Sequence, residues 1–145
     1  MTRAGVRALG LDLGSKRVGV AIGDRTGTIA SPLQVLQRSG SVKRDHVALA
    51  KLVIEEEADI VVVGLPLNMN GSSGPAAQAA IDEAAALATV VAVPVVTFDE
   101  RRTTVTADQA MMEAKMRAQA RRRIVDKIAA AVMLQNWLDA GGPRA

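Results

Sequence analysis

The chain has 145 residues, of which 49% are hydrophobic, and 18 basic against 15 acidic side chains give a net charge of +3. That length suits one domain, so we expect a single domain over residues 1–145 with an ordered core from about residue 6 to 139. No signal peptide or apolar membrane-spanning stretch is recognisable, which favours a cytoplasmic protein without a membrane partner. The lack of cysteine excludes disulfides and thiolate metal sites. The scarcity of aromatic residues argues against binding of single strands by stacked rings, although a basic chain suits a nucleic-acid partner.

Three strands are predicted in the first quarter of the chain. Short β-branched runs punctuated by glycine indicate a hairpin of Val6–Asp12 and Arg17–Asp24, followed by a third strand, Ile29–Gln37. Pro32 places the third strand at a sheet edge or at a bulge, because proline cannot donate to a strand ladder.

Helices and strands alternate after residue 40. Ser41 is a candidate N-cap for a helix reaching about Glu57, with an apolar stripe that includes Val42, Val47 and Ile54. His46 lies among charged neighbours and is interpreted as a surface residue. The remaining predictions are a central parallel strand (Ile60–Pro66), an alanine-rich helix (Pro75–Thr89), a last strand (Val90–Phe98) and two final helices (Thr103–Glu113 and Ile124–Leu138).

This order of elements predicts an α/β fold. Three antiparallel strands followed by alternation imply a mixed five-stranded sheet with helices on both faces. We see no internal repeat and no linker, and so assign no second domain.

Two acidic residues lie at or near the ends of predicted strands. Asp12 interrupts an apolar strand, where a carboxylate is costly to bury without a donor or a cation. Glu100, with Asp99 beside it, directly follows the last strand. If the two strands are parallel neighbours, Asp12 and Glu100 meet at the carboxyl edge of the sheet, where α/β folds place their sites.

Asp126 is a third candidate, at the beginning of the final helix. It shares a face with Ala129, Ala130 and Met133, and the small alanines allow that face to lie close to the sheet. A second interpretation stays open, in which Asp126 only satisfies the helix dipole or pairs with Arg122 or Arg123. Three converging carboxylates without His or Cys suit a hard cation such as Mg²⁺, and such ions support phosphodiester hydrolysis.

Cations gather near these acids. The cations that precede Asp126 could simply form the solvated start of a helix. Their position directly before a candidate acidic site favours contacts with a phosphate backbone instead. Asn68 and Asn70 follow the central strand and could bond phosphates or bases, or could simply serve a turn. The candidate nucleic-acid-binding cations other than Arg101 are Lys16, Arg17, Lys115, Arg117, Arg121, Arg122, Arg123 and Lys127.

Four segments in order resemble the YqgF (RuvX) family over about residues 8–138. They are 11–21 (LDLGSKRVGVA), 63–71 (VGLPLNMNG), 99–104 (DERRTT) and 126–131 (DKIAAA). The resemblance implies an RNase H-like fold and a nuclease, described either as a Holliday junction resolvase or as a processor of the 5′ end of pre-16S ribosomal RNA.

The resemblance also implies roles for single residues. Asp12, Glu100 and Asp126 match the three metal-binding acids of the family, so they are the expected catalytic and metal residues, with Mg²⁺ or Mn²⁺ as cofactor. The family often has Asp-Gly at Asn70-Gly71, which argues against a metal role for Asn70. It often has Leu-Ser-Thr at Arg102-Thr103-Thr104, so Arg102 adds a cation near the site. Lys16, Arg17, Arg101 and the basic stretch 115–127 would hold the nucleic-acid backbone.

Two other functions remain open on sequence grounds. The Asp-x-Gly-Ser hairpin also resembles the first phosphate loop of the actin and hexokinase superfamily, but 145 residues leave no room for the second domain of such proteins. The second open function is that of a non-catalytic nucleic-acid-binding protein of the same fold. The sequence does not choose between structured RNA and branched DNA, nor between a monomer and a homodimer, although symmetric junction cleavage would suggest a dimer.

Overall fold

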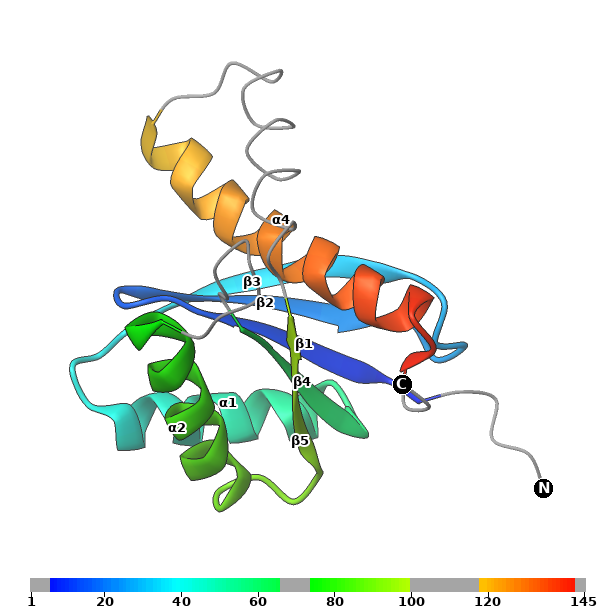
Figure 1. The fold of residues 1–145 in the computed structure, drawn as a ribbon, viewed down its shortest axis with the longest axis horizontal. Coiled ribbons are helices and arrows are strands. Elements are labelled where there is room, and N and C mark those ends of the chain that lie inside the picture. Colours follow the sequence, from blue (N-terminus) through cyan, green and yellow to red (C-terminus); the bar gives the residue numbers. More distant parts are fainter. Residues whose placement is uncertain (1–5, 66–73, 100–117, 143–145) are drawn as a thin grey trace.

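Five strands form one mixed sheet in the order β3-β2-β1-β4-β5 (Figure 1). The computed structural model describes residues 6–65, 74–99 and 118–142, except for the side chains of 99 and 118–127. The predicted helix Thr103–Glu113 and most of the loop after the central strand lie outside these ranges. The strands are β1 (Ala8–Leu13), β2 (Arg17–Gly23), β3 (Ala30–Gln37), β4 (Ile60–Leu65) and β5 (Val95–Asp99). The predicted sheet is therefore confirmed: β1–β3 are antiparallel, and β1, β4 and β5 are parallel.

Pro32 shows why β3 is an edge strand. The strand pairs with β2 alone, and its register shifts where Val20 faces Gln34 but Ala21 faces Pro32. Leu33 is thus the extra residue of a bulge. The sequence predicts that Pro32 lies either on an edge strand or at a bulge, and the structure shows both. Proline has no backbone N–H to donate, and this does no harm at either position.

Helices cover both faces of the sheet (Figure 1). Helices α1 (Val42–Glu55) and α2 (Pro75–Ala88) pack on the face that carries Leu9 and Leu11, whereas α4 (Ala118–Asp139) packs on the face that carries Ala8. Strand β4 is buried along Ile60–Gly64, as its unbroken apolar run predicts. No helix in the described part of the chain is both long and apolar enough to cross a membrane.

Gly10 lets α4 lie close to β1. A Cβ atom at position 10 would lie 3.0 Å from Leu134 Cβ, closer than side chains ordinarily pack. Helix α4 also begins at Ala118, six residues before the predicted start at Ile124, so the basic residues 121–123 belong to the helix and not to a loop before it. Good helix formers such as Ala, Gln and Arg fill these first turns, which explains the earlier start.

Helix α1 differs from its predicted pattern. Ser41 caps it as expected, its hydroxyl accepting a hydrogen bond from Arg44 N. However, Val47 and Ile54 are 63% and 75% exposed, while His46 is only 3% exposed. The prediction of His46 as a surface residue is therefore wrong. The buried row has helical spacing, but it includes two polar side chains: Asp45, His46, Leu49, Leu52 and Val53.

Ion pairs from neighbouring elements explain this polar burial. The Arg38 guanidinium, just after β3, makes a bidentate pair with Glu83 of α2 through Nη1 at 2.6 Å and Nη2 at 2.9 Å. His46 Nε2 lies 2.8 Å from Glu83 Oε2, and Asp45 Oδ2 lies 3.7 Å from Arg38 Nη1. We call Arg38, Asp45, His46 and Glu83 the Arg38 cluster. Buried charges are tolerated when they are paired in this way.

Both carboxylates of the Arg38 cluster favour the charged form. Burial raises the pKa of Glu83, but the hydrogen bonds from Arg38 and His46 outweigh it, so the pKa lies below its ordinary value. Burial also raises the pKa of Asp45, and the Ser39 amide together with Arg38 reverses the direction and lowers it. The Arg38 guanidinium and these two ionised carboxylates therefore join the end of β3 to α1 and α2.

The last strand is shorter than predicted. β5 begins at Val95 and not at Val90. The amides of Val90 and Val91 donate to Leu87 O at 2.9 and 3.1 Å, so they close the end of α2 and cannot join a strand ladder. Pro94 then precedes β5 and offers only its carbonyl, which accepts from Val61 N at 2.9 Å.

We predict that Gly10→Ala destabilises the protein by about 1–3 kcal/mol, because the new methyl group overpacks the contact with Leu134. Gly23→Ala is the matched control. Its Cβ would find its nearest neighbours at 3.5 Å, an ordinary contact. Urea unfolding of both variants measures the difference in the free energy of unfolding, and equal stability of the two variants would contradict the close approach of α4.

We predict that Glu83→Gln lowers the free energy of unfolding at pH 7 by about 1.5–3 kcal/mol, the range for hydrogen bonds to charged groups. Since the folded-state pKa of Glu83 is lowered, its contribution is present above the unfolded pKa near 4.5 and is lost as the pH falls through the folded pKa. The difference between variant and wild type should therefore shrink as the pH falls below about 4.5. Glu55→Gln, which removes an exposed carboxylate of α1, should show no such trend.

Candidate functional site

Asp12 lies near the carboxyl end of the central strand β1. It is half-buried, directly after the fully buried Leu11. Side chains alternate along a strand, so Asp12 shares the sheet face of Ala8 and Gly10, which is the face that α4 covers. The carboxyl edge of a parallel pair is where α/β sheets place ligands.

The strand register shows which residues lie level with Asp12. Leu11 pairs with Val63, so Asp12 is level with the next residue, Gly64, and Gly64 itself pairs with Phe98 of β5. Strand β5 ends at Asp99, at the same edge of the sheet. The strands β1 and β5 are parallel and end at the same edge, but they are not neighbours as the sequence-based condition required, because β4 lies between them. Glu100 and Arg101 follow directly and lie outside the described residues.

Helix α4 runs from this edge back along β1. Leu134 lies over Gly10, and Leu138 approaches the site of a Cβ on Gly23, beside Ala8. The helix therefore points its carboxyl end toward the start of β1. In Figure 1 the N-terminal end of α4, drawn in gold, lies at the same end of the sheet as the β1–β2 turn.

Position 126 falls near the same edge. It precedes Leu134 by eight residues, or about 12 Å of helix, while Asp12 follows Gly10 by two residues, or about 7 Å of strand. If α4 ran straight back along β1, the backbone of position 126 would lie about 5 Å past that of Asp12, or about one and a half strand residues. The alternative role for Asp126, satisfaction of the helix dipole, is weakened, because α4 begins at Ala118 and the dipole effect fades after the first turn.

The turn between β1 and β2 carries two candidate cations. Lys16 is exposed, and the half-buried Arg17 begins β2. Gly14 shapes this turn: its amide donates to Arg17 O at 2.9 Å and to Asp12 O at 3.1 Å. A Cβ on Gly14 would lie 2.6 Å from Arg17 O, so only glycine fits here. The turn therefore connects Lys16 and Arg17 directly to Asp12.

The other candidate residues are placed only in part. The helix α4 contains positions 121, 122, 123 and 127, whose side chains are not described. Asn68, Asn70, Lys115 and Arg117 lie outside the described residues.

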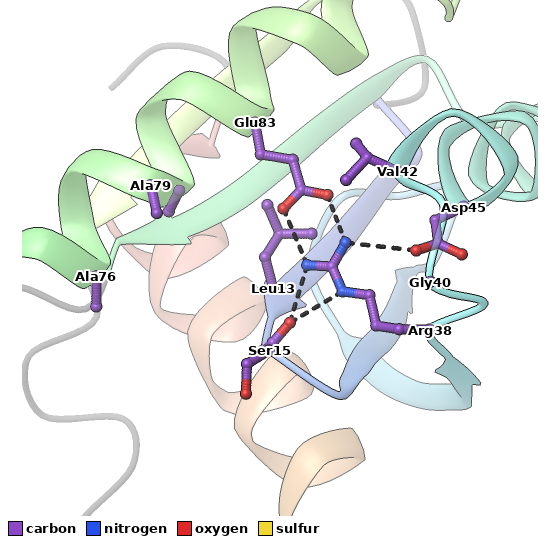
Figure 2. Close-up of a pocket in the computed structure, with 11 residues that line it drawn as sticks. Leu13, Ser15, Arg38, Gly40, Val42, Asp45, Ala76, Ala79 and Glu83 are labelled. Carbon is purple, nitrogen blue, oxygen red and sulfur yellow. Dashed lines mark hydrogen bonds and ion pairs between the residues drawn. The ribbon is translucent and has the colours of Figure 1, made fainter.

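A cavity of about 450 Å³ adjoins the turn on the α1/α2 side (Figure 2). Leu13, Gly14 and Ser15 line it from the turn, Ala76 and Ala79 from α2, and Val42 from α1. Figure 2 shows the Arg38 guanidinium at its base, held between Glu83 and Asp45. Sequence patterns did not reveal the Arg38 cluster. The available signal was the helical spacing of Asp45 and His46 with Leu49, Leu52 and Val53.

The one described side chain of the candidate trio, that of Asp12, is of a type that suits a hard divalent cation. Asp12 supplies carboxylate oxygens at a half-exposed edge, and oxygen ligands are those that Mg²⁺ and Mn²⁺ prefer. Within the described ranges no three acidic or histidine side chains are grouped to hold a metal ion, and of the candidate trio those ranges include only the side chain of Asp12.

Comparison with known sequences gives consistent matches along almost the whole chain. The protein is 48% identical to a "Putative pre-16S rRNA nuclease" of Mycobacterium sp. (strain KMS) over 134 residues, which cover 92% of this chain and 79% of that protein. Proteins of the same name in Myxococcus xanthus and Thermoanaerobacter pseudethanolicus are 44% and 40% identical, over 95% and 93% of this chain and 91% and 97% of theirs.

Solved structures share the fold at low sequence identity. RuvC of T. thermophilus in complex with a Holliday junction substrate matches with a TM-score of 0.57 at 16% identity, over 94% of this chain and 97% of that one. The yeast mitochondrial Holliday junction resolvase Ydc2 matches with a TM-score of 0.53 at 10% identity, over 96% and 82%. The RNase H-like fold class is thereby confirmed.

The family model "RuvX: Holliday junction resolvase" matches residues 6–140. Together with the curated relatives, that match over nearly the full length shows that the chain belongs to the RuvX family.

Proposed function

We propose that the protein is a metal-dependent nuclease that hydrolyses phosphodiester bonds of structured nucleic acid. The observation that carries the proposal is the place of Asp12, a carboxylate at the carboxyl edge of the central strand, in a family described as Holliday junction resolvase. Pre-16S rRNA, the substrate named for the curated relatives, and branched DNA are the two substrate classes to compare.

Asp12, Glu100 and Asp126 together would hold Mg²⁺ or Mn²⁺. Glu100 follows β5 directly in the sequence, Asp126 is a residue of α4, and both elements reach the sheet edge at which Asp12 lies. Bound there, the ions would supply an activated water and stabilise the charge on the leaving oxygen. Asp12 contributes oxygen ligands from a strand end whose backbone is fixed by pairing with Gly19.

The neighbouring cations would hold the nucleic-acid backbone. Lys16 and Arg17 stand in the turn directly after Asp12, and Arg101 follows Glu100. The basic stretch 115–127, with Asn68 and Asn70, would extend this contact. Such contacts position a substrate without reading its sequence, which suits an enzyme that recognises a structure.

We predict that Asp12→Asn reduces cleavage at least about 100-fold, because charge stabilisation by a bound metal is worth several kcal/mol. Cleavage of a four-way DNA junction and of a pre-16S rRNA fragment, each titrated with Mg²⁺ and with Mn²⁺, measures the effect and identifies the substrate class. Glu100→Gln and Asp126→Asn should behave alike.

Asp82→Asn is the matched control, since Asp82 is an exposed carboxylate of α2. Undiminished cleavage by Asp12→Asn, or full activity in excess chelator, would refute the metal-site assignment. Complementation of a deletion strain by the triple acid variant would favour a non-catalytic binding protein.

We predict that Arg122→Gln combined with Arg123→Gln weakens binding to RNA and to junction DNA alike. For each arginine that binds a phosphate in wild type, its replacement should reduce the slope of log K against log salt concentration by about 1. Lys51→Gln, a change of an exposed cation on α1, should leave binding and slope unaltered. Anisotropy titrations at several salt concentrations test this, and an unchanged slope in the double variant would exclude these arginines from the backbone contact.

A further inference from the structure

Asp12 lies within the β1–β2 hairpin. The antiparallel ladder of β1 with β2 runs through the Asp12–Gly19 and Leu13–Val18 pairs. The position of Asp12 therefore depends on the β1–β2 hairpin, and so on the turn that closes it. Within that turn, Gly14 N donates to Asp12 O itself.

Arg38 holds this turn at two carbonyls. Its side chain donates to Gly14 O from Nε at 3.0 Å and from Nη2 at 2.8 Å. Its backbone amide donates to Lys16 O at 2.9 Å. One residue thus fixes both the residue that bonds Asp12 and the residue that carries the exposed cation of the turn.

Arg38 is itself fixed from the helices. Its side chain is only 14% exposed, and Glu83 binds it through two parallel hydrogen bonds. Asp45 adds an ion pair, and the Ser39 amide donates to Asp45 at 3.0 Å, which fixes that carboxylate in turn. A planar guanidinium can bind a carboxylate and a carbonyl at the same time, and a lysine ammonium cannot reproduce this fork.

We propose that Arg38 is a positioning residue of the nuclease site, which acts on Asp12 through Gly14. The inference rests on the proposed function of Asp12 as a metal-binding acid. Arg38 lies on the α1/α2 side of the sheet and Asp12 on the α4 side, so Arg38 acts through the backbone of the turn and not by touching the substrate or the metal. Groups that orient a metal ligand in this way commonly change metal affinity or activity by about 10- to 100-fold.

Hydrogen exchange tests the mechanical step without any metal. In Arg38→Lys and Arg38→Met, the Gly14 amide should exchange at least about tenfold faster than in wild type, because the variants cannot form the charged hydrogen bonds that hold the turn. The amide of Val20, in the middle of β2, serves as internal reference and should change little. The lysine variant keeps the charge and guards against a folding failure of the methionine variant.

Arg7→Lys is the matched control. Arg7 is a similarly half-buried arginine, 22% exposed and paired with Glu56 at 3.2 Å, but it lies before the other end of β1. It should leave exchange at Gly14 unaltered. If Gly14 exchanges at the same rate in the Arg38 variants as in Arg7→Lys, the proposal is overturned, whatever the nuclease assays give.

Metal binding and kinetics test the consequence for the site. The Mn²⁺ concentration that broadens the Leu13 and Gly14 amide signals should rise about 10- to 100-fold in Arg38→Lys, and kcat should fall while KM for the nucleic acid stays the same. A loosened turn with unchanged metal binding and kcat would show a purely structural arginine and overturn the positioning role. Failure of the proposed function is recognised separately, by Asp12→Asn retaining full activity.

Discussion

The enclosure of β1 is the constraint on which the other elements depend. This strand pairs with β2 on one side and β4 on the other, and helices cover both of its faces. The two faces are enclosed differently: Leu9 and Leu11 fill the space toward α1 and α2, while Ala8 and Gly10 bring α4 against the backbone. A polar side chain on β1 can reach solvent only where this enclosure ends. Asp12 is placed there, half-buried after four fully buried residues.

The opposite side of the same strand end is organised by charge. Asp45 is buried and Arg38 and Glu83 are half-buried, an arrangement whose desolvation cost is offset only when every partner is in place. The gain is geometric definition, because directional ion pairs from two helices converge on one guanidinium, and that guanidinium fixes the turn. Apolar packing alone would hold α1 and α2 against the sheet, but it would not specify the position of individual carbonyl groups such as that of Gly14.

Sequence patterns predicted the five strands and the mixed sheet because these follow from short-range features. The Gly-Ser-Lys-Arg turn, Pro32 and the apolar run of β4 each have few structural solutions. The prediction of which side of α1 is buried was wrong for the opposite reason. His46 and Asp45 are buried only because Glu83 and Arg38, distant in sequence, satisfy them, and hydrophobic periodicity contains no term for such partners. Likewise, Asp12 could be identified from the sequence as an unusual acid in an apolar strand. The contact of Arg38 with Gly14 spans 24 residues, and no local sequence pattern indicates it.

The three elements that carry or precede the proposed acids differ in how firmly they are packed. Asp12 and Asp126 belong to elements that contact each other through Gly10 and Leu134, so the distance between their backbones is set by a close packing contact. Glu100 instead follows β5, which pairs with β4 alone at the edge of the described sheet and whose Val96 and Phe98 are only half-buried. Because an edge strand has fewer contacts to resist displacement, the carboxyl end of β5 is held less firmly than that of β1. The proposed metal site would therefore combine elements that are packed firmly, β1 and α4, with one that is packed less firmly, β5.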